Sequence, residues 1–173
     1  MTHPRKLIRL AIRDRLKAKA TMAGDNVFAS RIAPVTDDDY PAILIYTRGE
    51  ADYSEPVDGS LAWRKATITV VIEGLVRAGE TVDDKLDDMA SQIEDAMDGW
   101  RPDGFESALF TLKETDIDLV TEGVRKPIGA IGLTYEVQYR RKRLEEPNER
   151  IPDDVWSMFG DDPPRHLVKG GAP

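Results

Sequence analysis

The run Ala42–Tyr46, AILIY, is the feature that most limits how this chain can fold. A strand covered on one face alternates apolar and polar residues, whereas this run is apolar on both alternating faces. It therefore predicts a strand that is covered on both sides. Because two-sided cover is demanding for a single core built from 173 residues, we expect part of it to come from another subunit.

Alternation of apolar and polar residues predicts further strands. The clearest is Ala130–Arg140, in which every second residue is apolar. The others are Val27–Ile32, Trp63–Glu73 and Leu109–Leu119. The chain length favours one domain with a tail, and we place the domain at residues 1–143 and the tail at residues 144–173.

Two helices are predicted, at Thr2–Ala20 and Thr81–Asp98, with Thr2 capping the first and Gly99 ending the second. The apolar residues of the second helix fall within an arc of about 120°, as expected of a helix that buries one side. Those of the first spread over about 240°, too wide for a single surface. Its Leu10 is either covered on the flank by something else or simply exposed.

Charge is segregated between the two helices. Residues 1–24 carry seven basic side chains and one acidic, whereas residues 80–98 carry eight acidic and one basic. The acidic face is solvated, matched to a basic surface such as a neighbour's first helix, or a divalent metal site. The net charge of −8 argues against a general nucleic-acid binder, and the basic helix lacks interleaved aromatic residues that stack on bases.

Residue types that carry catalysis and metal binding are scarce. The chain has no cysteine, and its two histidines, His3 and His166, lie near the chain ends. It contains neither a nucleophile elbow nor a phosphate-binding loop, and we interpret the pairs Asp37/Asp39 and Asp116/Asp118 as solvated turns or edges. We therefore predict no enzymatic activity, no cofactor and no metal. The amino terminus does not look like a signal peptide, and no segment approaches the roughly 20 apolar residues that span a membrane.

Two segments have the composition of contact regions between chains. Arg48–Ser60, which carries Tyr53, is predicted to be a loop, and it is longer than most loops between paired strands. It is a contact loop or a mobile hairpin tip. The tail after Leu144 is rich in proline, glycine and acid, which is typical of disorder, yet an apolar cluster within it would suit an interaction arm: Val155, Trp156, Met158 and Phe159.

Together these segments resemble the tail terminator proteins of long-tailed bacteriophages, of the lambda type. The resemblance covers about residues 3–143 and rests on the order of the elements, namely a basic first helix, the strands PAILIYTRGE and RKATITVVIEG, the acidic helix DDKLDDMASQIEDAM and the strand IGLTYEVQYRR. It implies an α+β fold, a mixed, largely antiparallel β-sheet with two α-helices packed on one face, plus an extended C-terminal arm.

The resemblance also implies a structural role in the virion. Such proteins form a hexameric ring that caps the head-proximal end of the tail tube, ends tube polymerisation and forms part of the head-tail joint. The implied partners are further copies of the chain, the tail tube protein, a neck or connector protein and, in a contractile tail, the sheath protein. DNA would pass through the ring without sequence-specific binding, and no membrane is involved. The implied location is the neck region of the tail, after assembly in the host bacterial cytoplasm.

From this resemblance we expect ring contacts from the first helix and the following loop, through Arg9, Leu10, Arg13, Lys17, Arg48, Glu50 and Tyr53. The apolar cluster of the arm would bind a tube, sheath or neck partner. Two alternatives stay open: a neck or tail-completion adaptor of related fold, and a non-viral α+β binding or enzymatic domain.

Overall fold

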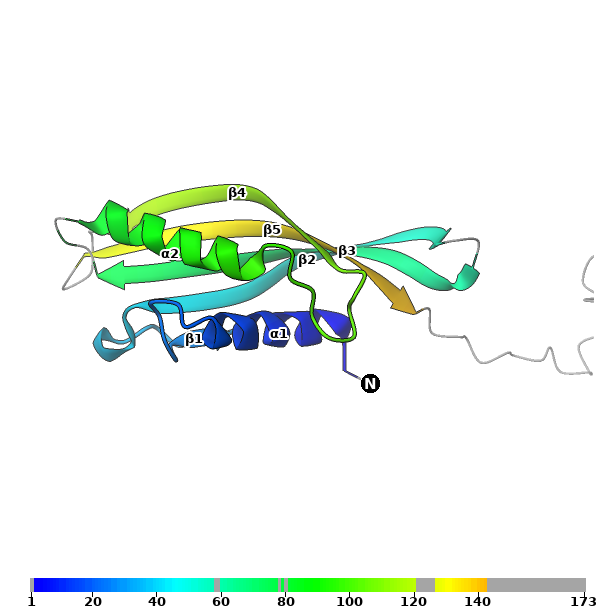
Figure 1. The fold of residues 1–173 in the computed structure, drawn as a ribbon, viewed down its shortest axis with the longest axis horizontal. Coiled ribbons are helices and arrows are strands. Elements are labelled where there is room, and N and C mark those ends of the chain that lie inside the picture. Colours follow the sequence, from blue (N-terminus) through cyan, green and yellow to red (C-terminus); the bar gives the residue numbers. More distant parts are fainter. Residues whose placement is uncertain (1, 58–59, 78, 80, 121–126, 143–173) are drawn as a thin grey trace, which may run out of the picture. The chain divides into compact units, whose positions relative to one another are not determined.

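The computed structural model describes residues 2–57, 60–77, 79, 81–120 and 127–142. These residues form a mixed sheet with two α-helices on one face (Figure 1). In chain order the elements are α1 (Pro4–Ala18), β1 (Val27–Ala29), a 3-10 turn (Asp37–Asp39), β2 (Ala42–Val57), β3 (Ser60–Arg77), α2 (Val82–Met97), β4 (Leu109–Val120) and β5 (Ile128–Lys142). The predicted α+β class and the order of helices and strands are confirmed.

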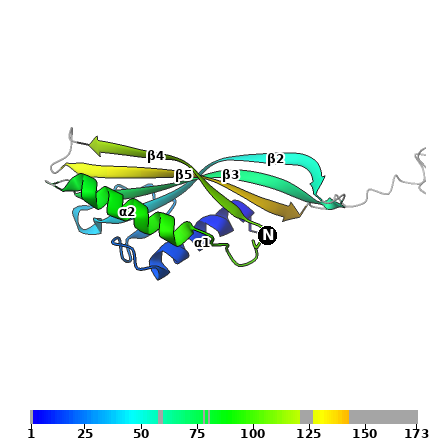
Figure 2. The same ribbon diagram turned by 45° about the horizontal axis from the view of Figure 1, so that its top comes forward.

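The strand order in the sheet is β1-β2-β3-β5-β4, so β1 and β4 are the outer strands. β1 runs parallel to β2, and the other neighbouring strands are antiparallel, which confirms the mixed, largely antiparallel sheet. α1 packs on β1 and β2, and α2 packs on β3 and β5. Each helix therefore covers one half of the same sheet face (Figure 2).

The main hydrophobic core lies between the helices and this sheet face. The narrow apolar arc of α2 is buried as predicted, through Leu86, Met89, Ala90, Ile93, Ala96 and Met97. α1 buries Ile8, Ile12 and Leu16, while Leu10 on its flank is half-buried. The prediction that Thr2 caps α1 is wrong. Because the helix begins at Pro4, His3 occupies the cap position, and its Nδ1 accepts a hydrogen bond from Arg5 N at 3.2 Å.

Glycines in the sheet allow α2 to lie close to it. A Cβ atom at Gly74 of β3 would lie 2.3 Å from Met89 Sδ, and one at Gly129 of β5 would lie 2.5 Å from Val82 Cγ2. At such distances the facing side chain or the helix would have to shift, so the two glycines help to set how near the helix can approach.

The start of β2 is buried on both faces, as its sequence predicts. Ile43 and Ile45 join the main core, whereas Ala42 and Leu44 join Leu75 in a second cluster on the opposite face. The expectation that another subunit supplies part of the cover is wrong, because residues of the same chain leave Leu44 only 7% exposed. The partly buried residues packed on this cluster are Phe28, Val35, Tyr40, Tyr46, Ile128 and Ala130.

Residues 30–41, between β1 and β2, contribute Val35 and Tyr40 to the cover of this cluster, and we call them the covering segment. Arg31 and Asp39 hold this segment in place. Arg31 Nη2 donates to Asp39 Oδ2 at 2.7 Å, and the guanidinium carbon lies 4.3 Å from the ring centroid of Phe28. The hydrogen bond from Arg31, helped by two from Thr36, lowers the pKa of Asp39 from 3.8 to about 2. Tyr46 Oη donates to Arg31 O at 2.9 Å. Asp39 is therefore a structural anchor and not the solvated turn residue that the sequence suggested.

The prediction of a loop over Arg48–Ser60 is also wrong. β2 continues to Val57 and β3 begins at Ser60, so the segment belongs to a long hairpin that extends beyond the helices (Figure 1). Tyr53 pairs with Lys65 across it, and the register is irregular between Tyr53 and Pro56. Where helices do not cover the sheet, strand pairing needs no apolar alternation, and the charged residues and Pro56 gave the segment the composition of a loop.

The compact unit that contains the described residues ends at Lys142. The predicted arm over residues 144–173 lies outside the described residues, together with its apolar cluster of Val155, Trp156, Met158 and Phe159.

Candidate functional site

Glu50 of β2 lies at the junction of the first helix and the sheet, and its side chain is 12% exposed. Its Oε1 accepts a hydrogen bond from Tyr139 Oη at 2.7 Å and lies 3.6 Å from Arg141 Nη1. Its Oε2 lies 3.0 Å from Arg5 Nε and 3.7 Å from His3 Nε2. The structure thus places this predicted contact residue inside the subunit, where it joins α1 to β2 and β5.

The basic residues that were predicted on α1 separate into two groups. Arg9 reaches the sheet, where its Nη1 donates to Thr47 Oγ1 at 2.7 Å. Arg13 pairs with Asp14 at 2.7 Å, and Lys17 is exposed. Arg13 is partly exposed and Lys17 is exposed, so both side chains remain accessible to other molecules.

The predicted contact residues of β2 lie apart from those of α1. Arg48 is exposed, and its guanidinium carbon stacks 5.0 Å from the ring centroid of Tyr46. Tyr53 lies further along the hairpin, opposite Lys65. The structure therefore brings Leu10, Arg13 and Lys17 together on one helix, with Arg48 and Tyr53 on the hairpin.

A groove beside the outer strand β1 has a basic lining. Its volume is about 400 Å³, and it lies between α1, β1 and the residues that follow β1. The basic side chains outnumber the acidic ones, because the lining consists of Arg13, Asp14, Lys17, Val27, Phe28, Ala29 and Arg31. We call this surface the basic edge.

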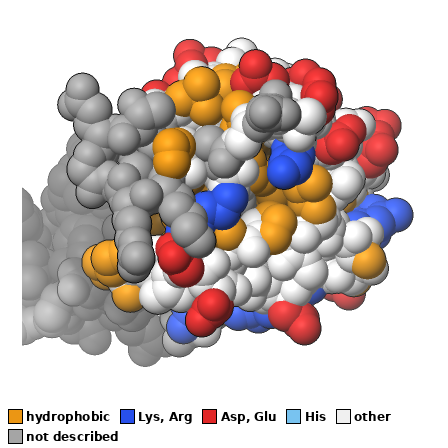
Figure 3. All heavy atoms as spheres, turned by 90° about the vertical axis from the view of Figure 1, so that its left-hand side faces the viewer, with side chains coloured by type: hydrophobic (Ala, Val, Ile, Leu, Met, Phe, Trp, Pro, Cys, Tyr) orange, Lys and Arg blue, Asp and Glu red, His pale blue; other side chains and the backbone are white. Residues whose placement is uncertain are grey.

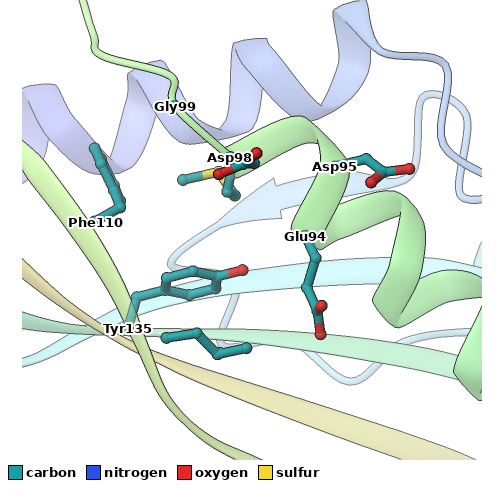
Figure 4. A pocket seen from close by; sticks show the side chains of 8 residues that line it. Glu94, Asp95, Asp98, Gly99, Phe110 and Tyr135 are labelled. Carbon is teal, nitrogen blue, oxygen red and sulfur yellow. The ribbon is translucent and has the colours of Figure 1, made fainter.

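A second groove lies near the opposite edge of the sheet, between the end of α2 and β4, and its volume is about 360 Å³ (Figure 4). Figure 4 shows Glu94 pointing from α2 toward the sheet beside Tyr135, while Asp95 turns away. The charged side chains of the lining are all acidic, because it consists of Glu94, Asp95, Met97, Asp98, Gly99, Phe110, Leu112 and Tyr135. We call this surface the acidic edge.

Tyr135 is the buried ionisable group of this groove. Burial, together with the negative charges of Glu94 and Asp98, raises its pKa to about 12. The hydroxyl therefore keeps its proton at neutral pH and is unsuited to act as a base or nucleophile. Among the described residues, no group of three or more His, Cys, Asp or Glu side chains is arranged to hold a metal ion. Nor does the described part of the chain include a helix long and apolar enough to cross a membrane.

Three exposed apolar side chains form a stripe along β4, on the face of the sheet that carries the helices. Leu112, Ile117 and Leu119 pair with Tyr135, Ile131 and Gly129 of β5, and they are 37%, 47% and 47% exposed. Strict alternation would place Leu112 and Ile117 on opposite faces. A bulge between Leu112 and Glu114 shifts the strand by one residue and puts them on the same face. This stripe was not predicted from the sequence for that reason.

Figure 3 views the molecule from the left-hand side of Figure 1. Acidic side chains are most numerous along the upper margin of this face and others lie in its lower half, while its centre exposes hydrophobic atoms beside Lys or Arg side chains. Charged side chains of both signs therefore lie beside exposed apolar atoms on this face. Such mixed surfaces are suited to binding other proteins.

Comparison with known proteins defines the class as structural proteins of phage tails. The model of the family "Phage minor tail protein U" matches residues 3–139. The chain belongs to this family of minor tail proteins, whose members are virion components. Among curated proteins, none matches the sequence. A solved chain from the "Virion of native gene transfer agent (GTA) particle" shares the fold, with a TM-score of 0.58 at 13% identity, covering 81% of this chain and 100% of that one.

Proposed function

We propose that this chain forms a hexameric ring that caps the head-proximal end of the tail tube, ends tube polymerisation and forms part of the head-tail joint. The observation that carries the proposal is the match of residues 3–139 to the phage minor tail protein U family. The fold shared with a chain of a gene transfer agent virion supports it.

A ring subunit needs two different side surfaces, because head-to-tail contacts are not self-complementary. α1 offers an outward flank with Leu10, Arg13 and Lys17, and the hairpin offers Arg48 and Tyr53. We expect these residues to contribute to the contacts with neighbouring subunits. Arg9 and Glu50 support the flank from inside the subunit, through Thr47 and Arg5.

The further partners follow from the same role. The ring would contact the tail tube protein on one side and a neck or connector protein on the other, and the sheath protein if the tail is contractile. DNA would pass through the ring without sequence-specific binding, and acidic side chains along the channel would keep the DNA from adhering. The subunits would assemble in the host cytoplasm.

Sedimentation and negative-stain microscopy of the full chain, alone and with the tail tube protein, test the ring. Six copies of the 19.3 kDa chain weigh about 116 kDa, and we expect particles of this mass either free or at tube ends. A chain that stays monomeric in both conditions and never occupies a tube end would contradict the proposal. Copurification with the connector and not with the tube protein would instead favour a neck adaptor.

A further inference from the structure

The two outer strands of the sheet carry grooves of opposite charge. The basic edge, beside β1, is lined by Arg13, Lys17 and Arg31 against one acid. The acidic edge, beside β4, is lined by Glu94, Asp95 and Asp98. Because β1 and β4 stand at the two ends of the strand order, these grooves lie near opposite edges of the same subunit.

Both edges also expose apolar side chains beside the charges. The acidic edge continues into the stripe of Leu112, Ile117 and Leu119 on β4. On the other side, Ile32, which follows Arg31 of the basic edge, is 98% exposed. β4 is an outer strand of twelve residues, and long outer strands with apolar residues are usually covered in the assembled state.

We propose that the acidic edge of one copy binds the basic edge of the next copy, so that acidic and basic edges alternate around the ring. The occupant of each groove is therefore a second copy of this chain. Contact between two acidic edges would bring Glu94, Asp95 and Asp98 against their own equivalents, which is unfavourable. Contact between unlike edges pairs opposite charges and covers the stripe, and it leaves each subunit free to bind a neighbour on both sides. The inference rests on the proposed ring function.

Charge reversal at each edge tests this contact. One variant reverses the basic edge with Arg13→Glu and Lys17→Glu, and another reverses the acidic edge with Glu94→Lys, Asp95→Lys and Asp98→Lys. Each variant alone would place like charges at every contact, and we expect ring association to weaken by on the order of 100-fold. Circular dichroism and thermal unfolding would confirm that each variant is folded.

Two further samples show whether the edges meet each other. An equimolar mixture of the two variants should form rings again, because in an alternating ring of six every contact would pair an acidic with a basic edge. A single chain that carries both reversals should likewise form rings. Matched controls with the same change of charge outside the grooves should assemble like the wild type. These are Lys6→Glu with Lys19→Glu, and Asp84→Lys with Asp87→Lys and Asp88→Lys, all at exposed positions.

The readout is ring formation, measured free in solution or at tube ends if the tube protein is required. Rings from both separate variants at wild-type concentration would overturn the edge contact while leaving the proposed capping function intact. Variants that fail separately and also fail when mixed would show that each edge binds a different protein, and this result too would overturn it. A wild-type chain that forms no ring in either condition would refute the inference and the proposed function together.

Discussion

Replacing Gly129 of β5 with alanine tests how closely α2 packs on the sheet. The added Cβ would lie 2.5 Å from Val82 Cγ2 and 3.2 Å from Leu86 Cδ1. Carbon atoms in contact are normally about 3.5–4.0 Å apart, so the first turn of α2 would have to move by roughly 1 Å. Such overpacking costs about 1–3 kcal/mol, and the smaller entropy of the unfolded alanine chain returns about 0.4–1 kcal/mol. We expect the free energy of unfolding to fall by about 1–2 kcal/mol.

Gly132 supplies the control, because it lies on the same strand but on the opposite face. A Cβ there would meet Asp116 O at 4.0 Å, so Gly132→Ala should be neutral or slightly stabilising. Adding Val82→Ala to Gly129→Ala should recover part of the lost stability, since it removes the nearest clashing atom. Urea unfolding of the full chain, followed by circular dichroism, measures all four proteins. Equal midpoints for the two glycine variants would refute the close packing of α2.

Three further predictions concern the α1 junction, the covering segment and the tail. Tyr139→Phe removes the 2.7 Å hydrogen bond to Glu50 and should lower the free energy of unfolding by about 1.5–3 kcal/mol; a wild-type urea midpoint would contradict this. Because the folded pKa of Asp39, about 2, lies below the ordinary 3.8, its carboxylate stabilises the fold fully above pH 3.8 and this contribution disappears as the pH falls toward 2. Thermal unfolding of Asp39→Asn should therefore lose less stability over that range than the wild type, and an equally steep loss would argue against the anchor. Deleting residues 145–173 should leave the ring intact but impair attachment to a tube, sheath or neck partner, and normal tail assembly by the truncated chain would refute the arm.

The parts of the fold that were predictable are those in which one face is buried and the other is solvated. β5 alternates because Ile131, Leu133 and Tyr135 face the helices while their neighbours do not, and α2 shows a narrow apolar arc for the same reason. The outer half of the β2–β3 hairpin has no helix above it, so no apolar pattern marks its register. Local composition therefore predicted a loop where long-range backbone pairing forms strands.

The contact surfaces were predictable where they depend on one element. Arg13 and Lys17 follow from the spacing of a single helix, and they line the basic edge. The junction around Glu50 was not predictable, because Tyr139 lies 89 residues away and only the fold brings the two together. The stripe on β4 depends on a bulge after Leu112, which changes the direction of every later side chain and leaves no clear signal in a single sequence.

The most direct test of the central claim is the length of tail tubes grown with and without this chain. Purified tail tube protein would be polymerised from a fixed number of initiation complexes, and tube lengths would be measured by electron microscopy. Our account predicts that added chain stops growth, with a ring at the growing, head-proximal end of each stopped tube and a stoichiometry of about six copies per tube. Tubes that continue to lengthen at the same rate, without the chain at their ends, would contradict it.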